Sequence, residues 1–261
     1  MEADPGVEPE PLPHLDGVLP DDEVHVWQVD LVAWEKATEP LLDLLDPEEK
    51  ARADRFKFPA PRNQFLISRT LLRRALGCYL GIEAGQVRFR TTKNGKPELA
   101  TNSGFDPLQF NLSHTEGITV LAIARRRQVG VDVERIRTDT NAIELAERFF
   151  SPPEVQWLRS QPAAEQIPAF FTCWTGKEAY IKADGEGLSM PLTSFGVLPL
   201  PGDAPSKLQL KVYDDPEEAR RWSIWRLQPG SGLRAALAVE GKSCRVRLGQ
   251  WPSPDTDADP R

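Results

Sequence analysis

The sequence predicts an α+β fold built from two similar halves. One long helical segment lies in each half, at residues 62–80 and 169–183, and several runs in each half alternate apolar with polar residues. Helices and strands distributed in this way pack as α+β layers around a shared core. The predicted organisation is a disordered N-terminal tail at 1–20, an N-terminal half at 21–126, a C-terminal half at 127–250 and a disordered polar tail at 251–261.

The N-terminal half begins with a strand, because residues 23–31 alternate and are rich in β-branched side chains. Asp46 is followed by a proline and, three residues on, by a glutamate, which predicts the start of a helix at 46–56. Apolar residues near helical spacing predict the long helix at 62–80. Residues 87–99 contain the turn pairs Asn-Gly and Lys-Pro, so we expect a strand followed by a loop.

A β-hairpin is predicted in the middle of the chain, with strands at 118–124 and 129–136 and a basic turn between them. The C-terminal half then repeats the plan of the first. A helix at 141–150 precedes a second helix start, in which Ser151 is followed by proline and glutamate. The long helix at 169–183 ends in glycines. Five strand-like runs follow, at 195–200, 207–213, 222–227, 233–240 and 244–249.

The composition excludes several classes of protein. With 40% hydrophobic and 27% charged residues, a chain of 261 residues can bury a globular core. The net charge of −7 repels nucleic-acid phosphates, so we expect no nucleic-acid partner. No apolar run approaches the ~20 residues of a membrane-spanning helix, and the acidic, proline-rich start lacks the basic and apolar segments of a leader. We therefore expect a cytoplasmic protein with no membrane partner.

Two carboxylates share one face of the predicted strand at 129–136. Alternation places Gly130, Asp132 and Glu134 on the same face, with the Cα atoms of the two acidic residues ~6.6 Å apart. Both carboxylates could then bind one hard divalent cation. The pattern also fits the solvated face of a hairpin. Gly130 favours a site, because a glycine within a strand often marks close approach of a ligand or of another backbone.

Glu178 and Lys182 lie four residues apart and therefore on one face of the long helix. One interpretation is a solvated salt bridge of a few tenths of a kcal/mol. The other is a phosphoryl-transfer site. In that site Glu178 joins Asp132 and Glu134 around Mg²⁺, which prefers oxygen ligands and substrate phosphates, and Lys182 lies beside the metal-bound phosphate.

Polar residues precede the predicted hairpin in the segment "FNLSHTEG". Asn111, Ser113 and His114 can each donate a hydrogen bond to a phosphate or carbonyl oxygen. Ser113 and His114 are sequence neighbours and lack the nucleophile elbow that exposes a serine. The segment therefore predicts no acyl-transfer triad.

Four sequence strings together are similar to the Sfp-type 4′-phosphopantetheinyl transferases. They are "NGKPEL", "NLSH", "GVDVER" and "WTGKEAYIK" with "GEGLSMPL" following, in this order between residues 94 and 192. The resemblance implies a pseudo-dimer of two α+β halves with coenzyme A bound in the cleft between them. It also implies the reaction, which is the Mg²⁺-dependent transfer of 4′-phosphopantetheine from coenzyme A to a serine of an apo acyl or peptidyl carrier protein. The released product is 3′,5′-ADP.

The same resemblance implies roles for particular residues. Asp132, Glu134 and Glu178 would hold Mg²⁺ against the pyrophosphate of coenzyme A. Glu178 would also draw the proton from the carrier serine through water. Lys182 would stabilise or protonate the leaving phosphate. Ser113 and His114 match contacts to the 3′-phosphate end of coenzyme A, and Lys96 matches a further coenzyme A contact.

Departures from the family pattern occur in the helix at 46–56, where basic residues often meet the 3′-phosphate. Arg52 fits one such position, but Glu49 occupies another, so Lys50 or Arg55 is the candidate substitute. Arg69 and Arg74 are either further phosphate contacts or solvated helix charges. The residues predicted to contact coenzyme A are Arg52, Arg69, Arg74, Lys96, Ser113, His114, Asp132 and Lys182.

Two other functions stay open at this point. An acidic pair beside a lysine could belong to a metal-dependent nuclease or phosphohydrolase, and a chain of this kind could be a catalytically idle module that binds coenzyme A or a carrier. The net acidity disfavours the nuclease, and the complete acidic set disfavours the idle module. Because the chain contains both halves, we expect a monomer. The sequence does not distinguish a fatty-acid, polyketide or peptide carrier, nor Mg²⁺ from Mn²⁺.

Overall fold

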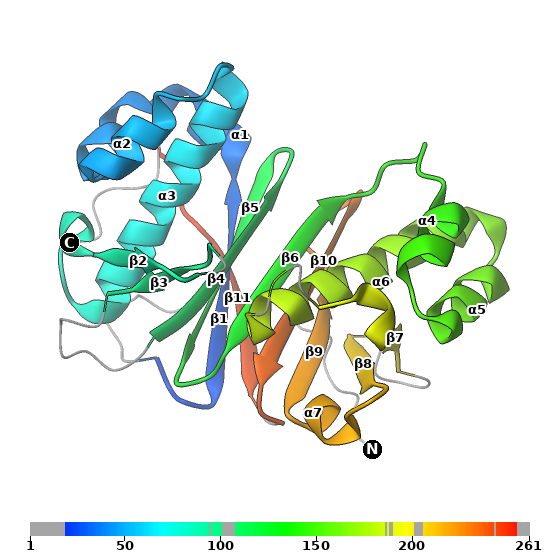
Figure 1. Cartoon of the computed structure of the whole chain (residues 1–261). Coiled ribbons are helices and arrows are strands. Elements are labelled where there is room, and N and C mark those ends of the chain that lie inside the picture. Colours follow the sequence, from blue (N-terminus) through cyan, green and yellow to red (C-terminus); the bar gives the residue numbers. More distant parts are fainter. Residues whose placement is uncertain are drawn as a thin grey trace.

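The computed structural model describes residues 19–93, 95–100, 108–185, 187, 190–200, 206–242 and 244–254. Two β-sheets lie side by side through the middle of the molecule, with one group of helices outside each sheet (Figure 1). This arrangement agrees with the predicted α+β halves. Most of the predicted tails lies outside the described residues. Two residues of those tails are nevertheless buried, Leu19 and Trp251.

The N-terminal sheet has the strand order β11-β1-β5-β4. Strand β1 is antiparallel to β5 and parallel to β11, and β5 is antiparallel to β4. Helix α3 (Pro59–Leu80) covers the outer face of this sheet. The other elements of this half are short. The bounds are β1 Glu23–Asp30, α1 Leu31–Trp34, 3-10 turns Glu35–Ala37, Glu39–Leu44 and Ala84–Gln86, α2 Pro47–Ala53, β2 Phe89–Thr91, β3 Pro97–Leu99, β4 Leu108–Thr115, β5 Ile118–Arg125 and β11 Arg245–Gln250.

The C-terminal sheet is antiparallel throughout, in the order β6-β10-β9-β8-β7. Helix α6 (Ala163–Asp184) crosses its outer face, and α4 and α5 lie at the far end of α6 (Figure 1). The bounds of the remaining elements are β6 Val129–Arg135, α4 Ala142–Phe149, α5 Pro152–Ser160, a 3-10 turn Leu192–Ser194, β7 Phe195–Pro199, β8 Lys207–Val212, α7 Pro216–Arg220, β9 Trp222–Leu227 and β10 Leu233–Glu240.

Both predicted helix starts are confirmed. Asp46 and Ser151 are N-cap residues of α2 and α5, and each helix has a proline at its start. In each case the glutamate three residues later completes a capping box, because its carboxylate accepts from the backbone N–H of the cap. Helix α6 ends at Gly185, whose φ of 85° is in the left-handed region that glycine adopts without strain.

The predicted hairpin at 118–136 is wrong. Strand β5 pairs with β1 and β4 in the N-terminal sheet, while β6 pairs with β10 in the other sheet. Both edges of β5 are thus already occupied, so β6 cannot add to it. Two further differences concern pairing. Residues 97–99 form a strand antiparallel to β2 instead of a loop, and β11, assigned by sequence to the C-terminal half, pairs with β1 of the N-terminal half.

The halves share a hydrophobic core between their sheets. Val24 and Val26 of β1 pack in one cluster with Val129, Val131 and Val133 of β6. Alternation along β6 therefore directs its valines into this core, and its glycine and acidic residues to the side of α6, as the sequence predicts. Of the helices that the structure describes, none is both long and apolar enough to cross a membrane.

Candidate active site

The site lies where the two halves meet, and Asp132 of β6 is its centre. The Asp132 side chain is buried, with a residue exposure of 4%. Its Oδ1 accepts hydrogen bonds from the Ser113 hydroxyl at 3.0 Å and from the Lys182 ammonium at 2.6 Å. Its Oδ2 is buried and accepts no hydrogen bond from the described residues. A buried carboxylate oxygen without a donor is costly unless a ligand or ion completes it.

Helix α6 reaches the site because β6 has a glycine under it. A Cβ added to Gly130 would overlap the carbonyl oxygen of Ala179 and the backbone N of Ala183, so only glycine allows this approach. The sequence prediction that Gly130 marks a close backbone approach is confirmed. Residues of the same stretch of α6, Glu178 and Lys182, are thereby placed beside the acidic face of β6.

Lys182 of α6 forms an ion pair with Asp132 of β6. No ion pair between Lys182 and Glu178 is present among the described residues. Its ammonium also donates to the Ser113 hydroxyl at 3.1 Å and to the Val131 carbonyl at 3.4 Å. The side chain as a whole is 29% exposed. The interpretation of Glu178 and Lys182 as a surface salt bridge is therefore not supported.

The acidic residues of the site oppose one another's ionisation. Burial, and then the negative charge of Asp132, raise the pKa of Glu178 above its ordinary value. The same two causes, with a further contribution from Glu178, raise the pKa of Glu134, while Lys182 and Arg137 act in the opposite direction. The three carboxylates thus share one electrostatic environment that would gain from an additional cation.

The fit of a divalent cation can be tested on these residues. The described residues contain no group of three or more His, Cys, Asp or Glu side chains already close enough to hold a metal ion. Asp132 nevertheless offers a buried Oδ2 without a donor, and two further carboxylates respond to its charge. Oxygen donors of this kind suit Mg²⁺. The donor chemistry of Asp132, Glu134 and Glu178 therefore suits the ion, although the three side chains are not gathered around one point in this structure, where Lys182 is the cation beside Asp132.

Strand β4 joins the site to the N-terminal half by side chains. The side-chain oxygens of Asn111, Ser113 and Thr115 accept from backbone N–H groups of β6, at 2.9, 3.3 and 3.4 Å. The donors are Val131, Val133 and Arg135. From sequence, Asn111 and Ser113 were expected to be donors to a phosphate or carbonyl oxygen. The polar alternation N-x-S-x-T was the signal that could have indicated this second use.

His114 lies near the same charges but is exposed. Partial burial against the protein, and then the Lys182 ammonium, lower the pKa of His114, whereas Asp132 acts in the opposite direction. His114 alternates with Ser113 on β4, and Ser113 is buried. The Ser113 hydroxyl donates to Asp132 and accepts from Lys182 and Val133, so its hydrogen-bonding capacity is used within the protein.

Lys96 reaches the site from the segment between β2 and β3. Its ammonium donates to the main-chain carbonyl of Lys182 at 2.9 Å, near the C-terminus of α6. Burial lowers the pKa of Lys96, while Glu98 and Asp184 favour the charged form. A residue of the N-terminal half therefore contacts the helix that carries Glu178 and Lys182.

The three arginines predicted to contact coenzyme A lie in different surroundings. Arg52 lies over the ring of Phe65, 5.2 Å from its centroid. Arg69 pairs with Glu49 and lies 4.1 Å from the centroid of Phe89. Arg74 lies over Trp34 and lines a small pocket with Trp251. The contacts described for these arginines do not bring them to Asp132, Glu134 or Glu178.

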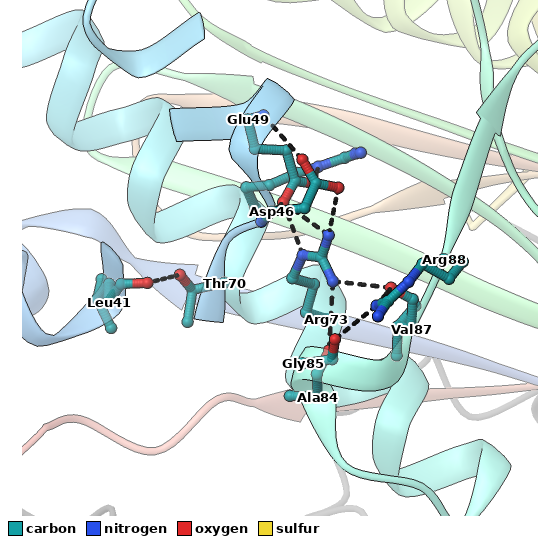
Figure 2. A network of polar contacts seen from close by, with 10 residues as sticks. Leu41, Asp46, Glu49, Thr70, Arg73, Ala84, Gly85, Val87 and Arg88 are labelled. Carbon is teal, nitrogen blue, oxygen red and sulfur yellow. Dashed lines mark hydrogen bonds and ion pairs between the residues drawn. The ribbon is translucent and has the colours of Figure 1, made fainter. Parts of the chain in front are cut away.

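Glu49 has a structural role. Its carboxylate caps α2 and accepts from Arg69 and from the fully buried Arg73, which also donates to Asp46 at 2.8 Å (Figure 2). The acidic residue at a family position that is often basic is therefore explained by packing of α2 on α3. The sequence patterns considered above did not indicate this role of Arg73. The capping glutamate was the available signal.

Three carboxylates, a lysine and a hydroxyl at the junction of two α+β halves are the components of a phosphoryl-transfer site. Comparison with known proteins identifies the class more closely. The chain matches the model of the 4′-phosphopantetheinyl transferase superfamily over residues 128–238. Residues 26–126 match the model of the N-terminal part of 4′-phosphopantetheinyl transferases.

Two relatives by sequence give the same result. The chain is 40% identical to the 4′-phosphopantetheinyl transferase HetI of Nostoc sp., over 84% of this chain and 89% of HetI. It is 30% identical to Sfp of Bacillus subtilis, over 69% of this chain and 81% of Sfp. A solved holo-[acyl-carrier-protein] synthase from Thermotoga maritima aligns with a TM-score of 0.36 and 23% identity, covering 44% of this chain and 63% of that protein.

The chain therefore belongs to the 4′-phosphopantetheinyl transferases, and it is of the Sfp type, as the sequence resemblance predicted. It is an enzyme that transfers phosphopantetheine to carrier proteins. The family is divalent-metal dependent, and its substrates are coenzyme A and an apo carrier protein.

Proposed function

We propose that this enzyme transfers 4′-phosphopantetheine from coenzyme A to a serine of an apo carrier protein at the junction of its halves, with release of 3′,5′-ADP and with Mg²⁺ as cofactor. The observation that carries the proposal is Asp132, which has one oxygen bonded to Ser113 and Lys182 and a second, buried oxygen without a described donor. Asp132, Glu134 and Glu178 would hold the metal. When bound, it would supply positive charge that neutralises the diphosphate.

Glu178 is proposed as the general base. Its carboxylate lies beside Asp132, whose charge together with burial raises the pKa of Glu178 in the metal-free protein. It accepts the serine proton through a water molecule, and the serine Oγ attacks the β-phosphorus of coenzyme A. The bond from that phosphorus to the bridging oxygen breaks, and 3′,5′-ADP leaves with this oxygen. The new phosphodiester holds phosphopantetheine on the carrier.

Lys182 is proposed to stabilise the charge that develops on the leaving phosphate. Its ammonium is held 2.6 Å from Asp132 and remains partly exposed, so it can contact a diphosphate without leaving the site. A fixed charge aimed at a phosphoryl transition state is worth a factor on the order of 10²–10³ in rate.

The remainder of coenzyme A is proposed to lie along the N-terminal half. His114 and Lys96 flank Lys182 and are candidate partners of the 3′-phosphate end, together with Arg52 from α2. Ser113 could donate to a phosphate only by giving up its bond to Asp132. Arg69 and Arg74 are less suited. Arg69 already pairs with Glu49, and Arg74 lies over Trp34. Because one chain supplies both sides of the site, we also propose that the enzyme acts as a monomer in the cytoplasm.

The test compares Glu178→Gln with Glu165→Gln, a control at an exposed position on the same helix. Each variant is incubated with coenzyme A, Mg²⁺ and a panel of apo carriers, and the products are measured by mass spectrometry. We expect the control to produce loaded carrier and 3′,5′-ADP, and Glu178→Gln to remain folded but lose transfer. Free phosphopantetheine with an unmodified carrier would indicate a phosphohydrolase. Binding of coenzyme A without any turnover by the wild type would indicate an idle module.

A further inference from the structure

The junction between the halves is not a continuous β-sheet. Among the described strands, β6 pairs through its backbone with β10 alone, and its other edge faces β4. Along that edge, three N–H groups donate to side chains of β4 instead of to backbone carbonyls. The bond to Asn111 is the shortest of the three, at 2.9 Å, and both Asn111 and its donor Val131 are buried.

The position of this bond relates it directly to the site. Val131 directly precedes Asp132, and its carbonyl oxygen accepts from the Lys182 ammonium at 3.4 Å. Val131 is therefore held by Asn111 through its N–H group and contacts Lys182 through its carbonyl oxygen. The next bond in the series, from Val133 to Ser113, fixes the residue that follows Asp132. Asp132 thus lies between two attachment points that β4 supplies.

We infer that Asn111 is a positioning residue: by accepting the Val131 N–H it fixes β6 against β4 and holds the Asp132 carboxylate where a divalent cation can bind. This inference rests on the proposed metal site. Asn111 has no direct contact with Asp132 among its described bonds and acts through the backbone of β6. Groups that hold metal ligands in orientation typically change metal affinity by 10–100-fold when removed.

The structure suggests a matched pair of variants. The other two attachment points use the hydroxyls of Ser113 and Thr115, so a hydroxyl on β4 is able to serve as acceptor for β6. Asn111→Thr retains a hydrogen-bond acceptor. Valine has almost the same shape as threonine, so Asn111→Val is the matched variant without an acceptor. Both replacements are β-branched and suit a strand. Ile123→Val, which removes one methylene group from the buried core of β5, is a control for general loss of packing.

Binding of Mn²⁺, used as a spectroscopic probe for Mg²⁺, is measured by electron paramagnetic resonance. The full-length protein is mixed with coenzyme A and no carrier, so no turnover occurs. We expect Asn111→Val to weaken Mn²⁺ binding by about 10-fold. Asn111→Thr and Ile123→Val should remain within about two-fold of the wild type. Equal affinities for Asn111→Thr and Asn111→Val would overturn the inference. Failure of the wild type itself to bind Mn²⁺ would instead contradict the proposed metal site.

Amide hydrogen exchange of the wild type provides a measurement that does not depend on variant folding. If Asn111 holds β6, the Val131 N–H should be protected about as strongly as the Asp132 N–H, which lies on the β10 side of the strand. Rapid exchange at Val131 with slow exchange at Asp132 would show that the bond does not hold the strand, and would overturn the inference even if Asn111→Val does not fold.

Discussion

Each half of the molecule contains a buried cation paired with the glutamate of a capping box. Arg73 of α3 pairs with Glu49 in the N-terminal half, and Lys177 of α6 pairs with Glu154 in the C-terminal half. Neither cation has any exposed side-chain surface. Each helix has 22 residues, and the cation occupies the same position along it, counted from the first residue of the helix. The two halves therefore use one device to attach a short capped helix to a long one.

The surroundings of the two pairs differ. Arg73 contacts two carboxylates, Glu49 and the one-third exposed Asp46, and also donates to the Val87 carbonyl (Figure 2). In contrast, Lys177 donates to both oxygens of Glu154 and to the Phe195 carbonyl, and the glutamate is fully buried. The N-terminal pair is a network with an opening to solvent, and the C-terminal pair is a closed one.

The residues that directly follow these two cations lie in different surroundings. Glu178 comes directly after Lys177, and its carboxylate responds to the charge of Asp132. Its counterpart Arg74 comes directly after Arg73 and lies over Trp34 beside Trp251. The same helix position therefore lies beside the acidic residues of the candidate site in one half and lines a small, mainly apolar pocket in the other. Similar scaffolds do not imply similar sites.

Breaking the closed pair should have the largest effect on stability. We expect Lys177→Met to reduce the free energy of unfolding by about 3–5 kcal/mol, because it leaves the Glu154 charge buried without a partner. Urea denaturation measures this loss. The double variant with Glu154→Gln should recover much of it, since no unpaired charge remains. Equal stabilities of the single and double variants would contradict this account.

Breaking the network around Arg73 should lower the free energy of unfolding by a smaller amount. Arg73→Met leaves Glu49 with Arg69, and Asp46 with partial access to water, so we expect a loss of about 1.5–3 kcal/mol, measured in the same way. A loss as large as that of Lys177→Met would show that the second cation and the solvent opening do not matter.

The contact of each long helix with its sheet offers a third comparison. In the N-terminal half the side chains of His25 and Tyr79 separate β1 from α3 and bond at 2.7 Å, whereas in the C-terminal half α6 touches β6 directly at Gly130. Gly130→Ala should destabilise the fold by about 1–3 kcal/mol. It should also reduce transfer on the order of 10²-fold, because Glu178 and Lys182 move with the helix.

Gly85→Ala is the control for the glycine variant, because a Cβ at Gly85 meets no atom within 4 Å. Calorimetry and the carrier-loading rate are measured for both proteins. Wild-type loading by a stably folded Gly130→Ala enzyme would show that the close approach is not needed.

The smallest effect concerns pH. Because burial and Asp132 raise the pKa of Glu178, its ionised form is disfavoured in the folded state. Without divalent metal, Glu178→Gln should therefore melt at a slightly higher temperature than the wild type at pH 8. The higher melting temperature of Glu178→Gln should decrease once the pH falls to the raised pKa of Glu178. It should be lost when the pH is below the ordinary carboxyl pKa, because Glu178 is then protonated in both the folded and the unfolded state. At the matched position, Arg74→Gln should show no such dependence on pH. Thermal melts across pH 4–8 test both expectations.

The parts of the fold with local signals were predictable from sequence. Asp46 and Ser151 were recognised as caps because the residues that cap a helix lie within one turn of each other. The acidic face of β6 followed from alternation, and Gly130 correctly indicated a close backbone approach. Family motifs supplied the reaction class, which the comparisons confirm.

The remaining features depend on partners distant in the chain. Alternation identified β5 and β6 as strands but not their neighbours, because pairing is decided by which sheet edges are free. Spacing placed Lys182 and Glu178 on one face of a helix, but it could not show that the ion pair of Lys182 is with Asp132 from another element. Trp251 was assigned to a polar tail, but its indole packs against Trp27 with ring centroids 5.4 Å apart.

Strand β11 has a consequence for how the protein is synthesised. It lies parallel to β1, so the sheet that begins with residues 23–30 gains its outer strand only when residues 245–250 have emerged from the ribosome. Until then β1 has an unpaired edge, and such edges invite association with other chains. Contacts between segments so distant in sequence also slow folding. The N-terminal sheet therefore cannot be completed until β11 is available to pair with β1.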